Sequence, residues 1–225
     1  MTATSIATRE ADSLSTAEFS ALRTATQDFV RQYMSRYDAS HDYAHIQRVH
    51  ALALRLAASH PSPLDLQLVS LSALLHDVGD HKYTSATTTT TPVQDFLLAA
   101  SCPPALARAV QTITASVSYS KESQNPDSVA EVLARYPELA VVQDADRIDA
   151  LGAVGVARCF VFGGVKSPER GLEGSVEHFG EKLLKLEALM KTAAGREIAR
   201  ERTRRIEVFW TWWKEENTLA EDEAL

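Results

Sequence analysis

Cysteine is scarce in this chain: Cys102 and Cys159 are the only two among 225 residues. Two cysteines are too few for the disulfide framework that stabilises small secreted proteins, and both lie among alanines and valines. We therefore expect reduced thiols buried in the core. Reduced thiols in turn favour a cytoplasmic location.

Basic residues are also in deficit, since 23 Lys and Arg stand against 30 Asp and Glu and leave a formal net charge of -7. Binding to a nucleic acid polymer depends on clustered cations, so this balance argues against such a partner. A small anionic ligand is still compatible with it, provided that a metal ion and a few local cations offset the repulsion. No apolar run approaches the length of about 18 residues that spans a bilayer, so we expect no membrane partner.

Strand patterns are missing as well, because almost every periodic segment has helical spacing. The sequence therefore predicts an all-α fold. We expect one domain over residues 16–216, with a flexible N-terminal tail at 1–15 and an acidic C-terminal tail at 217–225. The predicted helices span residues 16–36, 42–59, 63–78, 92–101 and 103–116, one helix from about 125, one after Pro137, and two long C-terminal helices at 175–191 and 194–216.

Local signals support several of these boundaries. Ser15 and Glu18 form a capping-box pattern before the first amphipathic stretch. Pro61 and Pro63 separate the second helix from the third, because proline is tolerated in the first helical turn but not in the interior. A threonine-rich run at 84–91 predicts a mobile loop, and the glycines between residues 163 and 174 predict a second loop.

Polar clusters on three apolar helical segments are the most informative feature of the sequence. They lie at residues 41–49, 71–79 and 143–149 and include the adjacent pair His76 and Asp77. Burying imidazoles and carboxylates is unfavourable unless they are paired or bind a metal. A lone histidine on an apolar helix is more often a hydrogen-bonded core residue, whereas the three clusters together favour a metal site.

The chemistry of such a donor set is hydrolytic. Imidazole suits Mn, Fe, Co, Ni or Zn, and carboxylates also admit Mg, so the residue types do not select one ion. A bound divalent ion acidifies water and neutralises phosphoryl oxygens. The clusters therefore predict hydrolysis of a phosphate ester or anhydride with a divalent ion as cofactor (Mn, Mg, Co, Ni or Fe).

These motifs resemble the HD-domain metal-dependent phosphohydrolases, whose pattern is H…HD…D. Residues 41–49 resemble the first ligand motif, residues 74–78 the HD doublet, and residues 144–152 the distal motif. The similarity extends to residues 157–160, 163–164 and 178–186, which look like the bacterial subgroup that hydrolyses nucleoside triphosphates to monophosphate and pyrophosphate. The resemblance covers about residues 18–215 and implies a single compact helical HD-domain bundle.

The resemblance also implies roles for individual residues. The implied metal ligands are His45, His76, Asp77 and Asp146. Asp77 and Asp80 are expected to be catalytic, and Asp80 falls where related members carry an acid that positions the attacking water or takes its proton. His81 replaces the second acid of the longer HDxxED pattern, which disfavours a guanosine-polyphosphate hydrolase.

Several cations are candidates for substrate binding. Lys82 is close enough to the HD doublet to reach a phosphate. His178, Lys182 and Lys185 form a polar helical stripe, which is either a solvated face or, as the resemblance favours, a phosphate-binding one. Residues 116 and 118–120 are weaker candidates for lining the pocket.

Asp149 is expected to contact substrate through the nucleoside sugar, with two alternatives left open. It lies one helical turn after Asp146 and could instead orient a ligating histidine. An ion pair with Arg48 or Arg147 is equally compatible with the sequence.

The preferred interpretation is a nucleotide phosphohydrolase that releases pyrophosphate from a (deoxy)nucleoside triphosphate. One alternative is a phosphomonoesterase acting on nucleoside monophosphates or another small phosphate ester. A second is a non-catalytic nucleotide-binding sensor. The aromatic cluster Phe209, Trp210, Trp212 and Trp213 is expected to pack the last helix onto the core or onto another subunit, so a homodimer stays open.

Overall fold

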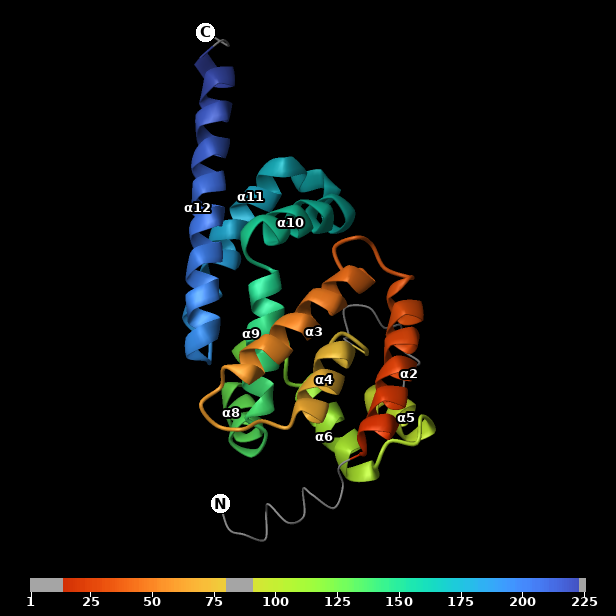
Figure 1. Cartoon of the computed structure of the whole chain (residues 1–225). Coiled ribbons are helices and arrows are strands. Elements are labelled where there is room, and N and C mark those ends of the chain that lie inside the picture. The colour runs from red at the N-terminus through yellow and green to blue at the C-terminus, as the bar shows by residue number, and fades with distance from the viewer. Residues whose placement is uncertain (1–13, 80–90, 223–225) are drawn as a thin grey trace.

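The computed structural model describes residues 14–79 and 91–222, and every regular element in these ranges is a helix (Figure 1). The all-α prediction is therefore confirmed. Most of the predicted N-terminal tail and of the threonine-rich segment lies outside the described residues. The α-helices are α2 (Thr16–Met34), α3 (Tyr43–Ala58), α4 (Leu66–Leu75), α5 (Pro92–Ala99), α6 (Pro104–Thr114), α7 (Tyr119–Gln124), α8 (Pro126–Arg135), α9 (Glu138–Asp149), α10 (Gly152–Lys166), α11 (Gly171–Glu181) and α12 (Ala193–Asp222).

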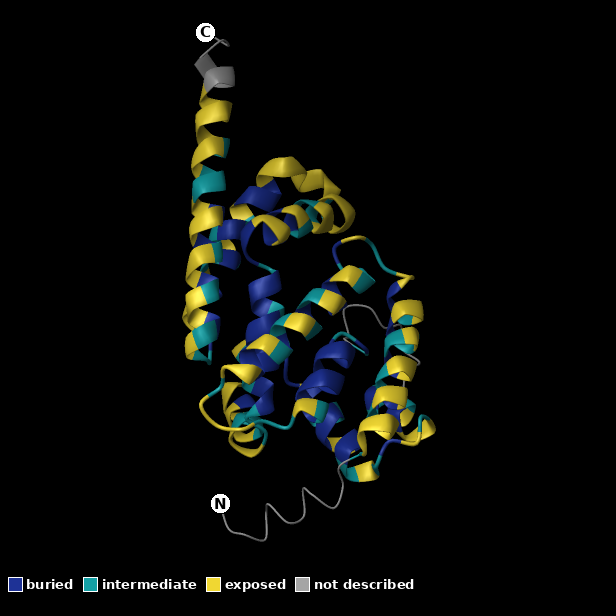
Figure 2. Ribbon diagram, in the orientation of Figure 1, coloured by how far each residue is buried: buried dark blue, intermediate teal, exposed yellow. Residues whose placement is uncertain are grey.

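Helix α4 occupies the centre of the N-terminal bundle. Residues 68–75 are all buried, and the helix packs against α2, α3, α6 and α9 (Figure 2). A helix that is apolar on every side requires cover on every side, which explains why its neighbours surround it. Because α4 ends at Leu75, the following residues, His76 and Asp77, enter the interior directly from the most buried helix.

Side-chain caps set the starts of the surrounding helices. The Ser15 hydroxyl accepts from the Glu18 amide while the Glu18 carboxylate accepts from the Ser15 amide, so the predicted capping box is confirmed. Asp42 caps α3 by accepting from the amide of His45 at 3.0 Å. This cap places His45 in the first turn of α3, at the end of the helix that faces the interior cavity.

Helix α9 connects the two halves of the molecule. Its residue Asp144 accepts hydrogen bonds from the amides of Lys191 and Thr192, both at 2.8 Å, immediately before α12 begins. After the C-terminal end of α9, Gly152 begins α10 with a φ of +70°, and α10 leaves at an angle of 71° to α9. The chain therefore turns sharply where the distal motif ends.

Aromatic rings attach α12 to α10 and α11. The ring centroids of Phe179 and Phe209 are 6.0 Å apart, and the Trp213 ring lies 5.7 Å from that of Phe160. The predicted packing of the last helix onto the core is confirmed for Phe209, Trp210 and Trp213, whereas Trp212 is 58% exposed. Figure 1 shows the C-terminal part of α12 extending beyond the body of the molecule.

One loop prediction and one helix prediction in the C-terminal region were wrong. The glycines at 163 and 164 belong to α10 and not to a loop. Gly163 allows α10 to pack closely on α11, because a Cβ there would lie 2.2 Å from the Ser175 hydroxyl. The helix predicted over 175–191 ends at Glu181 and is followed by two short 3₁₀ turns, Leu183–Lys185 and Glu187–Leu189. Buried Leu183 and Leu186 are three residues apart, a spacing that suits a 3₁₀ turn.

The last helix is longer than its predicted range of 194–216, since α12 continues to Asp222. Cys102 and Cys159 are buried and free, as expected, and burial raises the pKa of each thiol to about 11. Among the described residues no single helix is both long and apolar enough to cross a membrane. Helices α9 and α10 meet that criterion only when joined across their bend.

Replacing Asp144 by Ala tests the link between α9 and α12. The substitution leaves two partly buried amides without their acceptor, so we expect a loss of about 3 kcal/mol in the free energy of unfolding. Urea denaturation followed by circular dichroism measures it. As a control, Asp28→Ala removes an exposed ion pair with Arg31 and should change stability by less than about 0.5 kcal/mol. Equal losses in the two variants would contradict the proposed link.

Candidate metal centre

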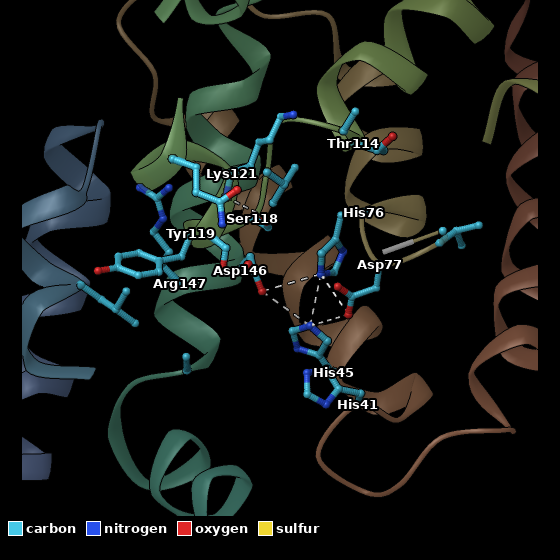
Figure 3. Close-up of a pocket in the computed structure, with 18 of the residues that line it drawn as sticks. His41, His45, His76, Asp77, Thr114, Ser118, Tyr119, Lys121, Asp146 and Arg147 are labelled. Atoms are coloured by element: carbon cyan, nitrogen blue, oxygen red, sulfur yellow. Dashed lines mark hydrogen bonds and ion pairs between the residues drawn. The ribbon is translucent and has the colours of Figure 1, made fainter. Parts of the chain in front are cut away.

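Four side chains from three segments converge at one wall of a cavity. His45 comes from α3, His76 and Asp77 follow α4, and Asp146 comes from α9 (Figure 3). The Nε2 atoms of His45 and His76 are 3.2 Å apart. One donor atom each from His45, His76 and Asp146 lie within 4.8 Å of one another. The predicted ligand set is thus brought together in space.

Hydrogen bonds on the far side of each imidazole aim its Nε2 atom at the common centre. His45 Nδ1 lies 2.7 Å from Asp149 Oδ2, and His76 Nδ1 lies 2.9 Å from the carbonyl oxygen of Ala73. Both acceptors require a proton on Nδ1, so Nε2 is the nitrogen of each ring that is left to bind an ion at the centre. This is the arrangement that a metal-ligating histidine needs.

The Asp77 carboxylate fits a metal site for a separate reason. Its Oδ2 atom is buried and has no hydrogen-bond partner among the described residues. It lies 3.3 Å from His45 Nε2 and 3.5 Å from His76 Nε2. A buried carboxylate oxygen without a donor is unfavourable unless a cation compensates it. The donor set of two imidazoles and two carboxylates therefore fits a divalent ion.

The electrostatics of these four side chains lead to the same conclusion. Burial disfavours the charged form of His76, but the carboxylates of Asp77 and Asp146 outweigh burial and raise its pKa to about 9. Burial would raise the pKa of Asp146, yet the neighbouring His76 lowers it to about 2. The pKa of Asp77 is lowered by His76 and His45 against the same opposing effect of burial. Carboxylates that stay ionised in a buried site attract a positive charge. In this site they favour the protonated form of His76, and a divalent ion would be favoured for the same reason.

Asp149 lies behind the centre and is not part of the cavity lining. Its side chain is 2% exposed, and besides His45 it accepts from Arg48 Nε at 2.7 Å and from an Arg158 NH group at 3.0 Å. Burial opposes its ionisation, but these contacts keep its pKa well below the usual range. This geometry favours the alternative in which Asp149 orients a histidine over the expected contact with a nucleoside sugar.

The cavity has a volume of about 600 Å³, within the usual range for small-molecule pockets. Besides the His/Asp centre, its lining includes Ser118, Tyr119 and Lys121 at the N-terminal end of α7 (Figure 3). Ser120 belongs to the lining as well. The weaker expectation for residues 118–120 is confirmed. Ser116 is absent from the described lining, because its hydroxyl donates to the Thr112 carbonyl and it is buried.

The predicted cationic stripe is divided by the end of α11. Lys182 lines the cavity, and its Nζ lies 5.6 Å from the Tyr119 ring centroid. The described lining includes neither His178, whose Nδ1 lies 3.3 Å from Glu181, nor the exposed Lys185. The stripe assumed one continuous helix, whereas the chain turns at Lys182. Asp80 and Lys82 lie outside the described residues.

Comparison with known proteins places the chain in a family. The HD domain model matches residues 42–151, which contain the whole His/Asp centre. The chain is 34% identical to the Bacillus subtilis (strain 168) protein YpgQ, which is named as uncharacterized, over 182 residues that cover 77% of this chain and 83% of YpgQ. The chain belongs to the HD-domain family. It is therefore a metal-dependent phosphohydrolase, and the resemblance noted in the sequence is confirmed at this level.

Solved structures agree with this assignment. A crystal structure of Bacillus subtilis YpgQ in complex with ADP matches with a TM-score of 0.67 and 30% identity, covering 87% of this chain and 96% of that one. An HD-superfamily hydrolase from Bacillus thuringiensis matches with a TM-score of 0.64 and 31% identity over 87% and 96% of the two chains.

Two residues that line the cavity had no predicted role, although both stand in the quoted motifs. His41 lines the cavity, and burial lowers its pKa to about 4, so its imidazole is neutral at physiological pH. Arg158 lines the cavity too and donates to the Ser40 carbonyl as well as to Asp149. Their positions within the quoted motifs were the signal, but sequence alone did not indicate which way the side chains point.

Metal affinity should fall as the pH falls, because the ion displaces the proton that His76 binds with a pKa of about 9. Below that pKa, each fall of one pH unit raises the ratio of protonated to neutral His76 tenfold. We expect the Kd for Mn²⁺, measured by isothermal titration calorimetry, to be about 100-fold weaker at pH 6 than at pH 8, with about one proton released at pH 7. The same Kd at both pH values would contradict this assignment.

The orienting role of Asp149 is tested by Asp149→Asn. The amide weakens control over the His45 tautomer, so the Mn²⁺ affinity should fall by about 10- to 100-fold. Asp127→Asn, which changes an exposed carboxylate on α8, is the matched control and should leave the affinity unchanged. Calorimetry of both variants decides the matter: wild-type affinity in Asp149→Asn would exclude the orienting role.

Proposed function

We propose that this HD-domain protein hydrolyses a nucleoside or deoxynucleoside triphosphate to the monophosphate and pyrophosphate. The observation that carries the proposal is the His/Asp centre, which forms one wall of a cavity that also contains Lys121 and Lys182. A divalent ion held by His45, His76, Asp77 and Asp146 would supply an acidified water molecule and neutralise phosphoryl oxygens. A triphosphate needs further cations, and lysine ammonium groups in the same cavity provide them.

The nucleotide part of the proposal is supported by a relative. Bacillus subtilis YpgQ was crystallised in complex with ADP, and its structure covers most of this chain. A cavity of about 600 Å³ is large enough for a ligand of this class. Within it, the hydroxyls of Ser118 and Tyr119 and the ammonium of Lys182 suit sugar and phosphate oxygens.

Other parts of the assignment are proposals as well. We propose Asp80 as the residue that positions the attacking water or takes its proton, and Lys82 as a further phosphate contact. Residues 16–216 are proposed as the phosphohydrolase domain. Manganese as the resident metal, a cytoplasmic location and a homodimer remain predictions.

A nucleotide panel tests the reaction. With Mn²⁺, Mg²⁺, Co²⁺ or Ni²⁺ present, the wild-type protein should convert one or more triphosphates to monophosphate and pyrophosphate, quantified by ion-exchange chromatography. Chelation should abolish turnover, and Asp77→Ala should reduce kcat by at least about 1,000-fold, because it removes a ligand from the centre.

The products distinguish the alternatives. Orthophosphate alone, released from a monophosphate, would support the phosphomonoesterase. Nucleotide binding without turnover under any of these metals would support the sensor. Hydrolysis by Asp77→Ala at the wild-type rate would exclude the proposed site.

A further inference from the structure

Helix α7 forms part of the cavity wall without a core of its own. Its six residues, Tyr119–Gln124, are polar apart from the tyrosine ring, and none of them is buried. Four of them nevertheless line the cavity: Tyr119, Ser120, Lys121 and Gln124. A helix this short is not stable by itself in water, so contacts with other segments must hold it in place.

Glu122 makes the strongest of these contacts. Its carboxylate accepts hydrogen bonds from the Arg147 guanidinium and from Lys191 Nζ, the latter at 2.6 Å. The amide of Gln143 lies 3.5 Å from Glu122 and also donates to the Ser116 carbonyl at 2.9 Å, just before α7. Glu122 thus connects α7 to α9 and to the segment that precedes α12.

The partners on α9 are arranged around the metal centre. Gln143 and Arg147 are separated by one helical turn and contact the α7 segment, whereas Asp146, between them in sequence, is directed at the histidines. The same helix therefore positions a candidate metal ligand and, through Glu122, the opposing wall. Movement of α7 relative to α9 would therefore change the distance between the candidate metal ligand Asp146 and the cavity wall formed by α7.

Charge pairing explains why this contact is maintained. The Arg147 side chain is 2% exposed, and a buried guanidinium without an anion is strongly unfavourable. Burial would raise the pKa of Glu122, but the hydrogen bonds from Lys191 and Arg147 lower it, so its carboxylate is ionised at neutral pH. Arg147 also donates to the Leu189 carbonyl at 3.0 Å, so its position is determined from two sides.

We propose that Glu122 is a positioning residue for substrate recognition. It fixes α7 against α9 and thereby holds Tyr119, Ser120 and Lys121 where they contact a nucleotide bound in the cavity. This inference rests on the proposed nucleotide function. The α7 side chains bind the nucleotide in the ground state and in the transition state alike, so loosening α7 weakens both, which raises KM and leaves kcat nearly unchanged.

The test compares Glu122→Gln with Glu131→Gln, which changes an exposed carboxylate on the neighbouring helix α8. For Glu122→Gln we expect KM for the hydrolysed triphosphate, and Kd for ADP with Mn²⁺ present, to rise about tenfold. The values of kcat and of Kd for Mn²⁺ should stay within about twofold of wild type. Hydrogen exchange of the amides of residues 119–124 should accelerate, while that of α4 should not change. Glu131→Gln should match wild type in every measurement.

Two results would overturn the proposal. Unchanged KM and ADP affinity in folded Glu122→Gln would exclude a positioning role. A loss of Mn²⁺ affinity equal to the rise in KM would show that Glu122 acts on the metal centre instead. If Glu122→Gln does not fold, Lys191→Met is the second variant, because it removes one cation from the same carboxylate. We expect it to raise KM and the Kd for ADP about threefold. Unchanged values of both would contradict the proposal.

Measurements on the wild-type protein separate a failure of the proposed hydrolase function from a failure of the proposed role of Glu122. A wild-type protein that binds ADP but does not hydrolyse triphosphates would contradict the hydrolase assignment, while the ADP affinities of the variants would still test Glu122. A wild-type protein that neither hydrolyses nor binds nucleotides would overturn both proposals.

Discussion

The need to pair charged groups buried on α9 determines how the site is built. Each polar side chain of this helix has a partner in a different segment: Asp144 holds the start of α12, Arg147 holds α7, and Asp149 holds the His45 imidazole. Asp146 is directed at both histidines. Leaving any of these groups unpaired in the interior would be costly, so the surrounding helices are constrained to positions that supply a partner. The metal centre is one result of this constraint.

Much of the site was predictable from sequence because its residues violate the pattern around them. His45, His76 and Asp146 stand in apolar helical segments where polar side chains require a reason, and the family resemblance supplied one. The role of Asp149 was harder to predict. Its neighbours in sequence allowed a sugar contact, an ion pair or an orienting bond. In the structure the buried Asp149 both pairs with Arg48 and bonds to His45.

The remaining features depend on contacts between segments that are distant in sequence. The break after α11 arises where Leu183 and Leu186 turn toward the core, although the sequence there is compatible with a continuous helix. Glu122 gave no signal, because it lies in a polar run typical of a solvated loop and its partners are 25 and 69 residues away. Local patterns identified the residues with unusual chemistry but not the ones that hold them in place.

The backbone turn between α9 and α10 also contributes to the position of the site residues. In a straight helix Asp149 and Arg158 would be about 13.5 Å apart along the axis, too far for an ion pair. The corner instead lets the two side chains meet, with Arg158 Nη1 at 3.0 Å from Asp149 Oδ2. At this corner a Cβ on Gly155 would lie 2.1 Å from the Ala150 carbonyl oxygen, so a methyl group there would open the angle. The absence of a single side chain in α10 thus helps to determine the direction in which an imidazole of α3 faces.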